Sequence, residues 1–301
     1  MRIAITGPRG QLGRSLQARL AGHDLLLLGR PEHDVTVVDR IAPAIVDFRP
    51  DVVIHTAAYT DVDGCARDPD RAYLVNALGT QNVARACQSA GAALVHISTN
   101  EVFDGRKEEP YLEYDLRAPI NAYGWSKYAA ERCVEMLLER FYIVRVSWLF
   151  APGTSNFVSK ICALAKERGR LAIVTDEIGS PTYAPHLAEA LAKLIESEHY
   201  GMYHLTNEGS CSRYEFAEHF LPLAGLGHVP LDRITSDQFQ RASRPPVYGV
   251  LRNFAAARLL GDPVHERVMN VATAIEMIHG ASLVHDDLID GASLRRGHRT
   301  L

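Results

Sequence analysis

Long apolar runs are missing from this sequence, and so is an excess of positive charge. No stretch approaches the ~20 apolar residues that a membrane-spanning helix needs, so we expect no membrane partner. The formal net charge of -4 provides no basic surface for nucleic acid, so we expect no nucleic-acid partner either. The sequence starts directly on an apolar segment and a glycine-rich turn, so we expect no signal peptide and a cytoplasmic location.

Cysteine is also scarce. The five cysteines are odd in number, scattered and without a Cys-x-x-Cys pair: Cys65, Cys87, Cys133, Cys162 and Cys211. This pattern favours reduced thiols over disulfides or a zinc site. The histidines show no ligand spacing, and we interpret His55 and His96 as packing or surface residues.

A glycine-rich turn stands near the start of the chain. An apolar strand predicted at 2–6 is followed by Gly7, Gly10 and Gly13 as a helix begins at about residue 11. The three glycines would allow a tight turn, a close backbone approach to a pyrophosphate, and close packing of helix on strand. The spacing GxxGxxG is a weak signal alone, but between a strand and a helix it predicts a dinucleotide site at the helix N-terminus.

A second motif predicts acid-base chemistry. A strand at 92–98 leads to Ser98 and Thr99, and Tyr123 and Lys127 lie four residues apart on one helix face. A phenol titrates near pKa ~10, and an ammonium one turn away would favour its anion. Thr99 could hold the substrate oxygen that Tyr123 protonates, which suits hydride transfer to a ketone. An ordinary surface Tyr–Lys pair is the alternative, which the glycine turn disfavours.

The order of predicted elements indicates an α/β fold of the Rossmann type, with a doubly wound parallel sheet. Predicted strands at 2–6, 24–29, 51–56, 92–98 and 141–147 alternate with helices at 11–22, 38–48, 70–90 and 122–139. Beyond Ser147 we expect a helix at 155–168, a strand at 171–175, a loop at 179–182, a helix at 184–196 and a strand at 201–206. We therefore divide the chain into an NAD(P)-binding domain (1–150, with a return segment near 178–195), a smaller substrate-binding lobe (151–260) and a helical tail (261–301).

Eight segments occur in an order and spacing that resemble the extended short-chain dehydrogenase/reductases, and among them the dTDP-4-dehydrorhamnose reductase family. They are TGPRGQLG (6–13), DVVIHTAAYTDVD (51–63), VNALGTQNVARAC (75–87), HISTNEVFDG (96–105), NAYGWSKYAAE (121–131), RVSWLFAPGTSNFV (145–158), IGSPTYAPHLAEAL (178–191) and SRPP (243–246). The resemblance covers about residues 1–260. It implies NAD(P)H-dependent reduction of the C4 keto group of a dTDP-4-keto-6-deoxy sugar, with a sugar-nucleotide substrate, and it leaves a homodimer open.

The resemblance also implies roles for single residues. Tyr123 matches the proton donor, Lys127 its partner, and Thr99 the hydroxyl that tunes the tyrosine and touches the sugar. Trp148 falls where the family places an aromatic ring against the substrate, although it could equally be a core residue. The implied cofactor contacts are Gly7, Gly10, Gln11, Leu12, Gly13, Ala57, Ala58, Tyr59, Tyr123 and Lys127.

Two positions depart from the family pattern. Asn100-Glu101 replaces the usual Asp-Tyr; Asn100 can still hydrogen-bond a sugar hydroxyl, but the change puts the identity of the sugar in doubt. His186 stands where the family often has Asp, at the junction of the lobes.

Cofactor choice depends on the residue after the second strand, where an acidic side chain would favour NAD. Here that strand runs into Arg30, which could meet a 2′-phosphate, so we expect NADPH with NADH tolerated. A solvated loop arginine is the alternative. The cluster Lys166, Arg168 and Arg170 could face a substrate diphosphate, but a solvated helix end is the preferred interpretation.

Residues 268–301 do not fit this family and resemble a fragment of a trans-polyprenyl diphosphate synthase. Asp286, Asp287 and Asp290 would hold Mg²⁺ against a diphosphate, with Arg295 and Arg296 on the phosphates, only within a complete synthase. The second aspartate cluster of such an enzyme is missing from this sequence, so we expect no metal site and no prenyl transfer. Mg²⁺ stays a possible cofactor, although no residue pattern in the sequence argues for it.

Two rival functions stay open. One is a non-catalytic NAD(P)-binding regulatory subunit on the same fold, like the beta subunit of methionine adenosyltransferase. The other is a reductase for a different 4-keto sugar nucleotide.

Overall fold

The central feature is a six-stranded sheet. A computed structural model describes residues 1–260, 294–295 and 298–299. The sheet has the order β10-β5-β4-β3-β1-β2, and every neighbouring pair is parallel. Its strands are β1 (Arg2–Thr6), β2 (Asp24–Leu28), β3 (Val52–His55), β4 (Ala93–Thr99), β5 (Phe141–Val146) and β10 (Gly201–His204). All four residues of β3 are buried, as expected for a parallel sheet covered on both faces.

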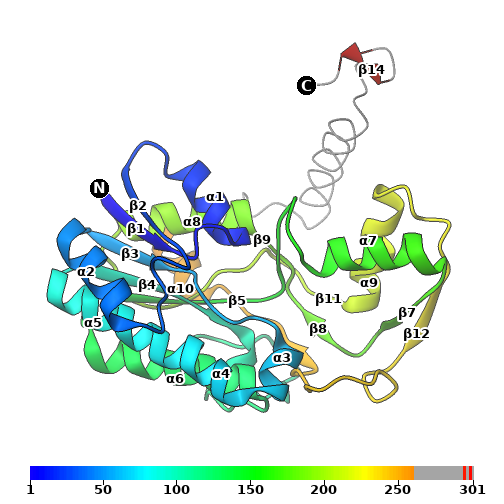
Figure 1. Cartoon of the computed structure of the whole chain (residues 1–301). Helices are drawn as coiled ribbons and strands as arrows, with labels where there is room; N and C mark the ends of the chain where they lie inside the picture. The colour runs from blue at the N-terminus through cyan, green and yellow to red at the C-terminus, as the bar shows by residue number, and fades with distance from the viewer. Residues whose placement is uncertain (261–293, 296–297, 300–301) are drawn as a thin grey trace.

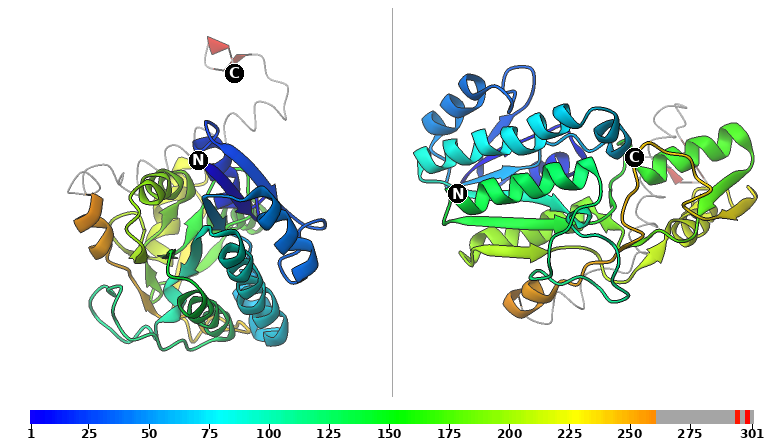
Figure 2. Two further views of the ribbon diagram at one scale, coloured as in Figure 1. Left: turned by 90° about the vertical axis from the view of Figure 1, so that its left-hand side faces the viewer. Right: turned by 90° about the horizontal axis from the view of Figure 1, so that it is seen from below.

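Helices cover both faces of this sheet. α1 (Gln11–Arg19) and α8 (Ala184–Glu196) pack together on one face, and α2 (Val38–Phe48), α5 (Gly79–Ala90) and α6 (Ala122–Leu137) cover the other (Figure 1). Seen from below, α5 and α6 run side by side across the sheet (Figure 2, right). The predicted doubly wound α/β fold is confirmed.

Two details of the connections differ from the prediction. The helix predicted at 70–90 consists of α4 (Pro69–Tyr73), a π-helical turn (Leu74–Leu78) and α5, and it is preceded by the short helix α3 (Val62–Arg67), which was not predicted. The side chains of Asp61 and Asp68 cap α3 and α4 by accepting hydrogen bonds from Gly64 and Arg71. These caps explain why one helix begins at Val62 and another begins at Pro69.

A second lobe lies beyond the carboxyl ends of the strands, on the right of Figure 1. It contains α7 (Phe157–Arg168) and α9 (Arg213–Leu223) around an aromatic core that includes Phe150, Phe216 and Phe220. Its strands are β7 (Leu171–Val174) with β12 (Leu231–Ile234), β6 (Leu149–Phe150) with β9 (Thr182–Tyr183), and β8 (Ile178–Gly179) between β11 (Cys211–Ser212) and β13 (Tyr248–Gly249). α10 (Phe254–Leu260) returns to the main sheet at β10.

The order of the strands in the sheet determines where a ligand-binding crevice can form. β1 is flanked by β2 on one side and β3 on the other, so the chain leaves β1 and β3 toward opposite sides of the sheet. In open parallel sheets a ligand crevice forms at such a switch point, outside the carboxyl ends of the strands. Gly7 follows β1, Thr56 follows β3, and Thr99 ends β4, so these residues meet at that crevice.

Some expectations concern residues outside this description. The helical tail and its candidate ligands Asp286, Asp287 and Asp290 lie outside the described residues; β14 (Leu294–Arg295) and β15 (His298–Arg299) form an antiparallel pair. In the part of the chain that the structure describes, no helix has both the length and the apolar character to cross a membrane. No group of three potential metal ligands occurs among those same residues, and the five cysteines are free.

Candidate active site

The glycine turn after β1 is shaped for close backbone approach. Gly7 has φ +66°, and a Cβ there would lie 2.9 Å from the backbone nitrogen of Ala57. A Cβ at Gly13 would lie 2.8 Å from Pro8 Cα, so this glycine lets α1 pack against the turn. Gly10 precedes α1, and no side chain caps the helix, so its first N–H groups remain available to an anion. This arrangement fits a dinucleotide pyrophosphate.

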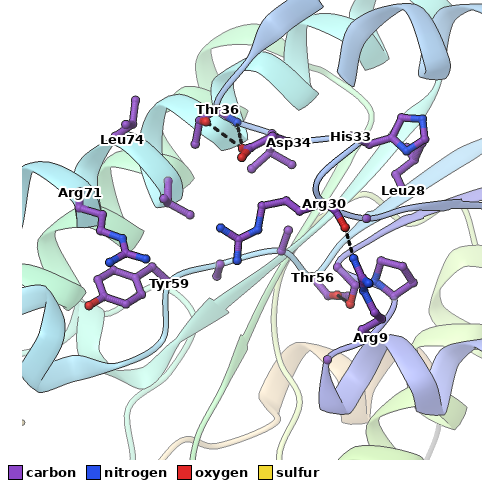
Figure 3. A pocket seen from close by; sticks show the side chains of 18 residues that line it. Arg9, Leu28, Arg30, His33, Asp34, Thr36, Thr56, Tyr59, Arg71 and Leu74 are labelled. Atoms are coloured by element: carbon purple, nitrogen blue, oxygen red, sulfur yellow. Dashed lines mark hydrogen bonds between the residues drawn. The ribbon is translucent and has the colours of Figure 1, made fainter. Parts of the chain in front are cut away.

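A cavity of about 580 Å³ opens beside this turn (Figure 3). Arg30 is exposed, lines the cavity, and extends its side chain toward Tyr59 and Arg71. Arg9 donates a hydrogen bond to the Arg30 carbonyl oxygen, which anchors the backbone after β2. The Arg71 guanidinium stacks over the Tyr59 ring at 4.6 Å. The cavity therefore has a cationic wall, as a 2′-phosphate would require.

Asp34 also lines this cavity, and sequence analysis missed it. Thr36 donates to Asp34 Oδ1 from its backbone nitrogen at 2.9 Å and from its hydroxyl at 2.8 Å. Although burial alone would raise the pKa of Asp34, these hydrogen bonds and nearby Arg30 and Arg40 lower it. A carboxylate thus lies in the same cavity as Arg30, only four residues further along the chain.

The loop after β3 is fixed to the catalytic helix. The backbone nitrogen of Tyr59 donates to Asn76 Oδ1 at 2.7 Å, and Asn76 Nδ2 donates to Ser126 Oγ on α6 at 2.9 Å. Ala57 and Ala58 line the cavity beside Arg30, and Ala58 also lines the next one. Asn76 was not singled out from the sequence because it lies mid-helix, and only packing reveals its two contacts.

All three predicted catalytic residues line a second cavity of about 670 Å³, next to the first. Thr99 comes from the end of β4, whereas Tyr123 and Lys127 come from α6. The structure brings these three together with Gly10, Gln11, Leu12, Ala58, Asn100 and Trp148. Gly13 lines neither cavity and acts through helix packing.

The electrostatic setting of Tyr123 differs from the expectation. Burial raises the pKa of the Tyr123 phenol, the charge of Glu101 raises it further, and hydrogen bonding with Thr99 opposes both effects. The expected lowering by Lys127 is absent from these causes. Desolvation dominates because Tyr123 is 9% exposed and Lys127 directs its ammonium elsewhere. Tyr123 therefore stays protonated at neutral pH, which is the form that donates a proton.

Lys127 is held by the sheet. Its Nζ donates to the Ile97 carbonyl oxygen at 2.7 Å and lies 3.3 Å from His96 Nε2. Burial lowers the pKa of Lys127 to about 8, partly offset by the negative charge of Glu131. His96 is fully buried and stacks against His55, and burial lowers the pKa of both imidazoles. The interpretation of these histidines as packing residues agrees with this geometry.

A buried network of ion pairs and hydrogen bonds connects α6 to the sheet. Glu131 Oε1 accepts from Ser98 Oγ at 2.5 Å and from Arg145 Nε at 2.9 Å, while Oε2 accepts from Arg145 Nη2 at 2.9 Å and Arg117 Nη1 at 3.0 Å. Burial alone would raise the pKa of Glu131, but these four hydrogen bonds hold it below its usual value. The network ties α6 to β4 and β5 and so fixes Lys127, one turn earlier.

Trp148 closes the cavity on the side of the second lobe. Its backbone adopts φ +45°, which is rare for a bulky residue, and a Cβ at Gly179 would lie 2.6 Å from the indole ring. The Arg213 guanidinium stacks on the ring at 3.6 Å. Trp148 therefore both lines the cavity and packs against the aromatic core of the lobe. Arg213 was missed because it lies on α9, far along the chain.

The basic cluster Lys166, Arg168 and Arg170 lies outside the catalytic cavity. Lys166 and Arg168 are exposed, and Arg170 pairs with Asp232 at 2.5 Å, so the cluster is a solvated helix end. Lys160, earlier on α7, does line the cavity. His186 Nδ1 lies 3.0 Å from Asn207 Nδ2 at the start of α8, outside both cavities.

Comparisons with known proteins identify the family of this chain. The family model described as the RmlD substrate binding domain matches residues 1–279. The spore coat polysaccharide biosynthesis protein SpsK of Bacillus subtilis is 36% identical over 268 residues, which is 88% of this chain and 94% of that protein. The dTDP-4-dehydrorhamnose reductase of Mycobacterium tuberculosis is 39% identical over 284 residues, with 91% and 92% covered. The crystal structure of dTDP-4-dehydrorhamnose reductase from Bacillus anthracis in complex with NADP matches with a TM-score of 0.83 and 41% identity, covering 86% of this chain and 92% of that one.

Proposed function

This chain belongs to the RmlD substrate-binding-domain family, and from that premise we propose that it reduces the C4 keto group of dTDP-4-dehydrorhamnose to give dTDP-L-rhamnose. The observation that carries the proposal is the meeting of Thr99, Tyr123 and Lys127 in one cavity beside an uncapped glycine turn. The proposal is supported by relatives of similar length and 39–41% identity that are named dTDP-4-dehydrorhamnose reductase.

NADPH is the proposed cofactor, with NADH tolerated, and when bound it supplies the hydride. The glycine turn (Gly7, Gly10) and the first N–H groups of α1 would hold the pyrophosphate. Arg30 would hold the 2′-phosphate of NADPH, and Asp34 would accept a hydrogen bond from the free 2′-hydroxyl of NADH. Further contacts come from Gln11, Leu12, Ala57, Ala58 and Tyr59.

The protonated phenol of Tyr123 carries the acid chemistry. Thr99 and Tyr123 hydrogen-bond the substrate carbonyl oxygen, and Tyr123 gives its proton to that oxygen as the carbon is reduced. Lys127, one turn from Tyr123 on the same face of α6, would bind a cofactor ribose hydroxyl. Asn100 hydrogen-bonds the sugar, and Trp148 packs against it.

An NADPH-oxidation assay with dTDP-4-dehydrorhamnose and a panel of other 4-keto sugar nucleotides tests the proposal. Fastest turnover of dTDP-4-dehydrorhamnose is expected. Turnover of another sugar alone would favour the alternative reductase, and cofactor binding without turnover of any sugar would favour the regulatory subunit.

Replacing Arg30 tests the cofactor assignment. Arg30→Ala is expected to weaken NADPH binding by ~1–3 kcal/mol, the range for a charge-assisted hydrogen bond, and to leave NADH almost unchanged. Calorimetric titration of both cofactors measures this. Arg168→Ala is the matched control, because Arg168 is exposed on α7 and lies outside the cavity. Equal losses for both cofactors would show that Arg30 has another role.

The pKa of Lys127 predicts a pH dependence. Because burial lowers this pKa to about 8, kcat/KM is expected to fall as the pH rises above about 8, where the ammonium loses its charge. A steady-state pH profile checks this. A flat profile up to pH ~9 would contradict the assigned role.

The proposal extends to a cytoplasmic location and a homodimer. Fractionation of cells that express the chain tests the location, and sedimentation analysis of the purified protein tests the dimer.

A further inference from the structure

Glu101 is an acidic side chain in the wall of the catalytic cavity that the proposed proton transfer does not use. It lies in the 3-10 turn Asn100–Val102, directly after β4, and its backbone nitrogen donates to Thr99 Oγ1 at 3.2 Å. Its side chain is partly buried and lines the cavity with Thr99 and Tyr123. The carboxyl group therefore stands beside the two groups assigned to the substrate carbonyl.

One oxygen of this carboxyl is already used. Oε2 accepts a hydrogen bond from Asn121 Nδ2 at 2.7 Å, and Asn121 Oδ1 caps α6 by accepting from the Gly124 nitrogen at 2.8 Å. Within the described part of the chain, Oε1 accepts no hydrogen bond. The contact with the helix cap thus fixes the side chain and leaves its second oxygen for a ligand.

Charge around Glu101 limits what that ligand can be. Burial raises the pKa of Glu101 above its ordinary value, although the hydrogen bond from Asn121 and the guanidinium groups of Arg241 and Arg213 oppose this shift. Arg241 is itself paired with Asp63 at 3.2 Å, and Arg213 with Glu177 at 3.6 Å. A carboxylate repels a phosphate or a carbonyl oxygen and binds hydrogen-bond donors. A ligand group bound at Glu101 must therefore be a hydrogen-bond donor and not a diphosphate.

We propose that Glu101 is a specificity-determining residue whose Oε1 accepts a hydrogen bond from the sugar hydroxyl next to the reacting carbonyl. In a 4-keto-6-deoxy pyranose the carbonyl is flanked by C3, which carries a hydroxyl, and by C5, which carries a methyl group. Only C3 offers a donor, so Glu101 selects for a free 3-hydroxyl. This assignment rests on the proposed function, because it takes the position of the carbonyl from Thr99 and Tyr123.

The test compares two substrates with three proteins. We would measure kcat/KM of the wild type, Glu101→Leu and Glu101→Gln for the 4-keto-6-deoxy sugar nucleotide and for its 3-deoxy analogue. The wild type is expected to prefer the hydroxylated substrate about 10- to 100-fold, the worth of one hydrogen bond to a charged group. Glu101→Leu should lose this preference. Glu101→Gln, which keeps the size and a neutral acceptor, should retain a preference of about 3- to 10-fold.

The analogue separates recognition from support of the helix. If Glu101 only braces Asn121, each substitution will lower kcat/KM equally for both substrates, and the proposal is overturned. A wild type that reduces both substrates with equal efficiency overturns the Glu101 assignment and leaves the reductase function standing. A wild type that reduces neither overturns both. Should Glu101→Leu fail to fold, the reduced preference expected of Glu101→Gln still decides the question.

Discussion

Tyr123→Phe is expected to lower turnover by ~10²-fold or more while the fold and the cofactor affinity persist. The substitution removes only the phenolic oxygen, and the ring keeps its packing against Cys65 and Ala72. Because the raised pKa of Tyr123 keeps it protonated, the lost group is a proton donor at every pH near neutrality. Steady-state NADPH oxidation measures the loss, and cofactor titration checks that binding is unchanged.

Tyr128→Phe is the matched control for this experiment. Tyr128 lies on the same helix, five residues along, but it lines neither cavity and stacks with Arg117 at 5.0 Å. Its variant should retain nearly normal turnover. Near-normal turnover of Tyr123→Phe itself would remove the proton-donor assignment.

Glu131→Ala should cost the largest share of stability, about 3–5 kcal/mol of the free energy of unfolding, the range for breaking a buried ion pair. Glu131 is 0% exposed and accepts four hydrogen bonds, so its removal leaves Arg145, itself 1% exposed, without its carboxylate partner. Urea unfolding followed by circular dichroism measures the change. Glu189→Ala is the matched control, because Glu189 pairs with Lys193 on the solvent-exposed side of α8, and it should cost no more than ~0.5 kcal/mol.

The same network predicts how stability depends on pH. The pKa of Glu131 is lower in the folded protein than its ordinary value of 4.5, so the unfolded chain binds the proton first. Its contribution is complete above pH ~4.5 and is lost as the pH falls through the lower, folded pKa. Unfolding midpoints of the wild type and Glu131→Ala should therefore converge below that pH. If the difference between the two unfolding midpoints stayed constant as the pH fell below ~4.5, this account would be contradicted.

The sequence by itself determined the parts of the molecule that depend on short stretches of chain. Gly7, Gly10 and Gly13 lie between one strand and one helix, and their turn requires small residues whatever the rest of the chain does. The spacing of Tyr123 and Lys127 places them on one helix face by helix geometry alone. Alternation of strands and helices likewise predicted the parallel sheet, because crossover connections have one favoured hand.

Tertiary structure alone decided the charges and the far wall of the site. The direction of the pKa shift at Tyr123 follows from burial and from Glu101, and neither can be read from a tyrosine and a lysine one turn apart. Asp34 faces Arg30 only because the loop after β2 folds back into the cavity. Arg213 reaches Trp148 from a helix 65 residues later in the chain. Desolvation and Coulomb energies depend on distances between segments that packing brings together, and sequence spacing carries no measure of those distances.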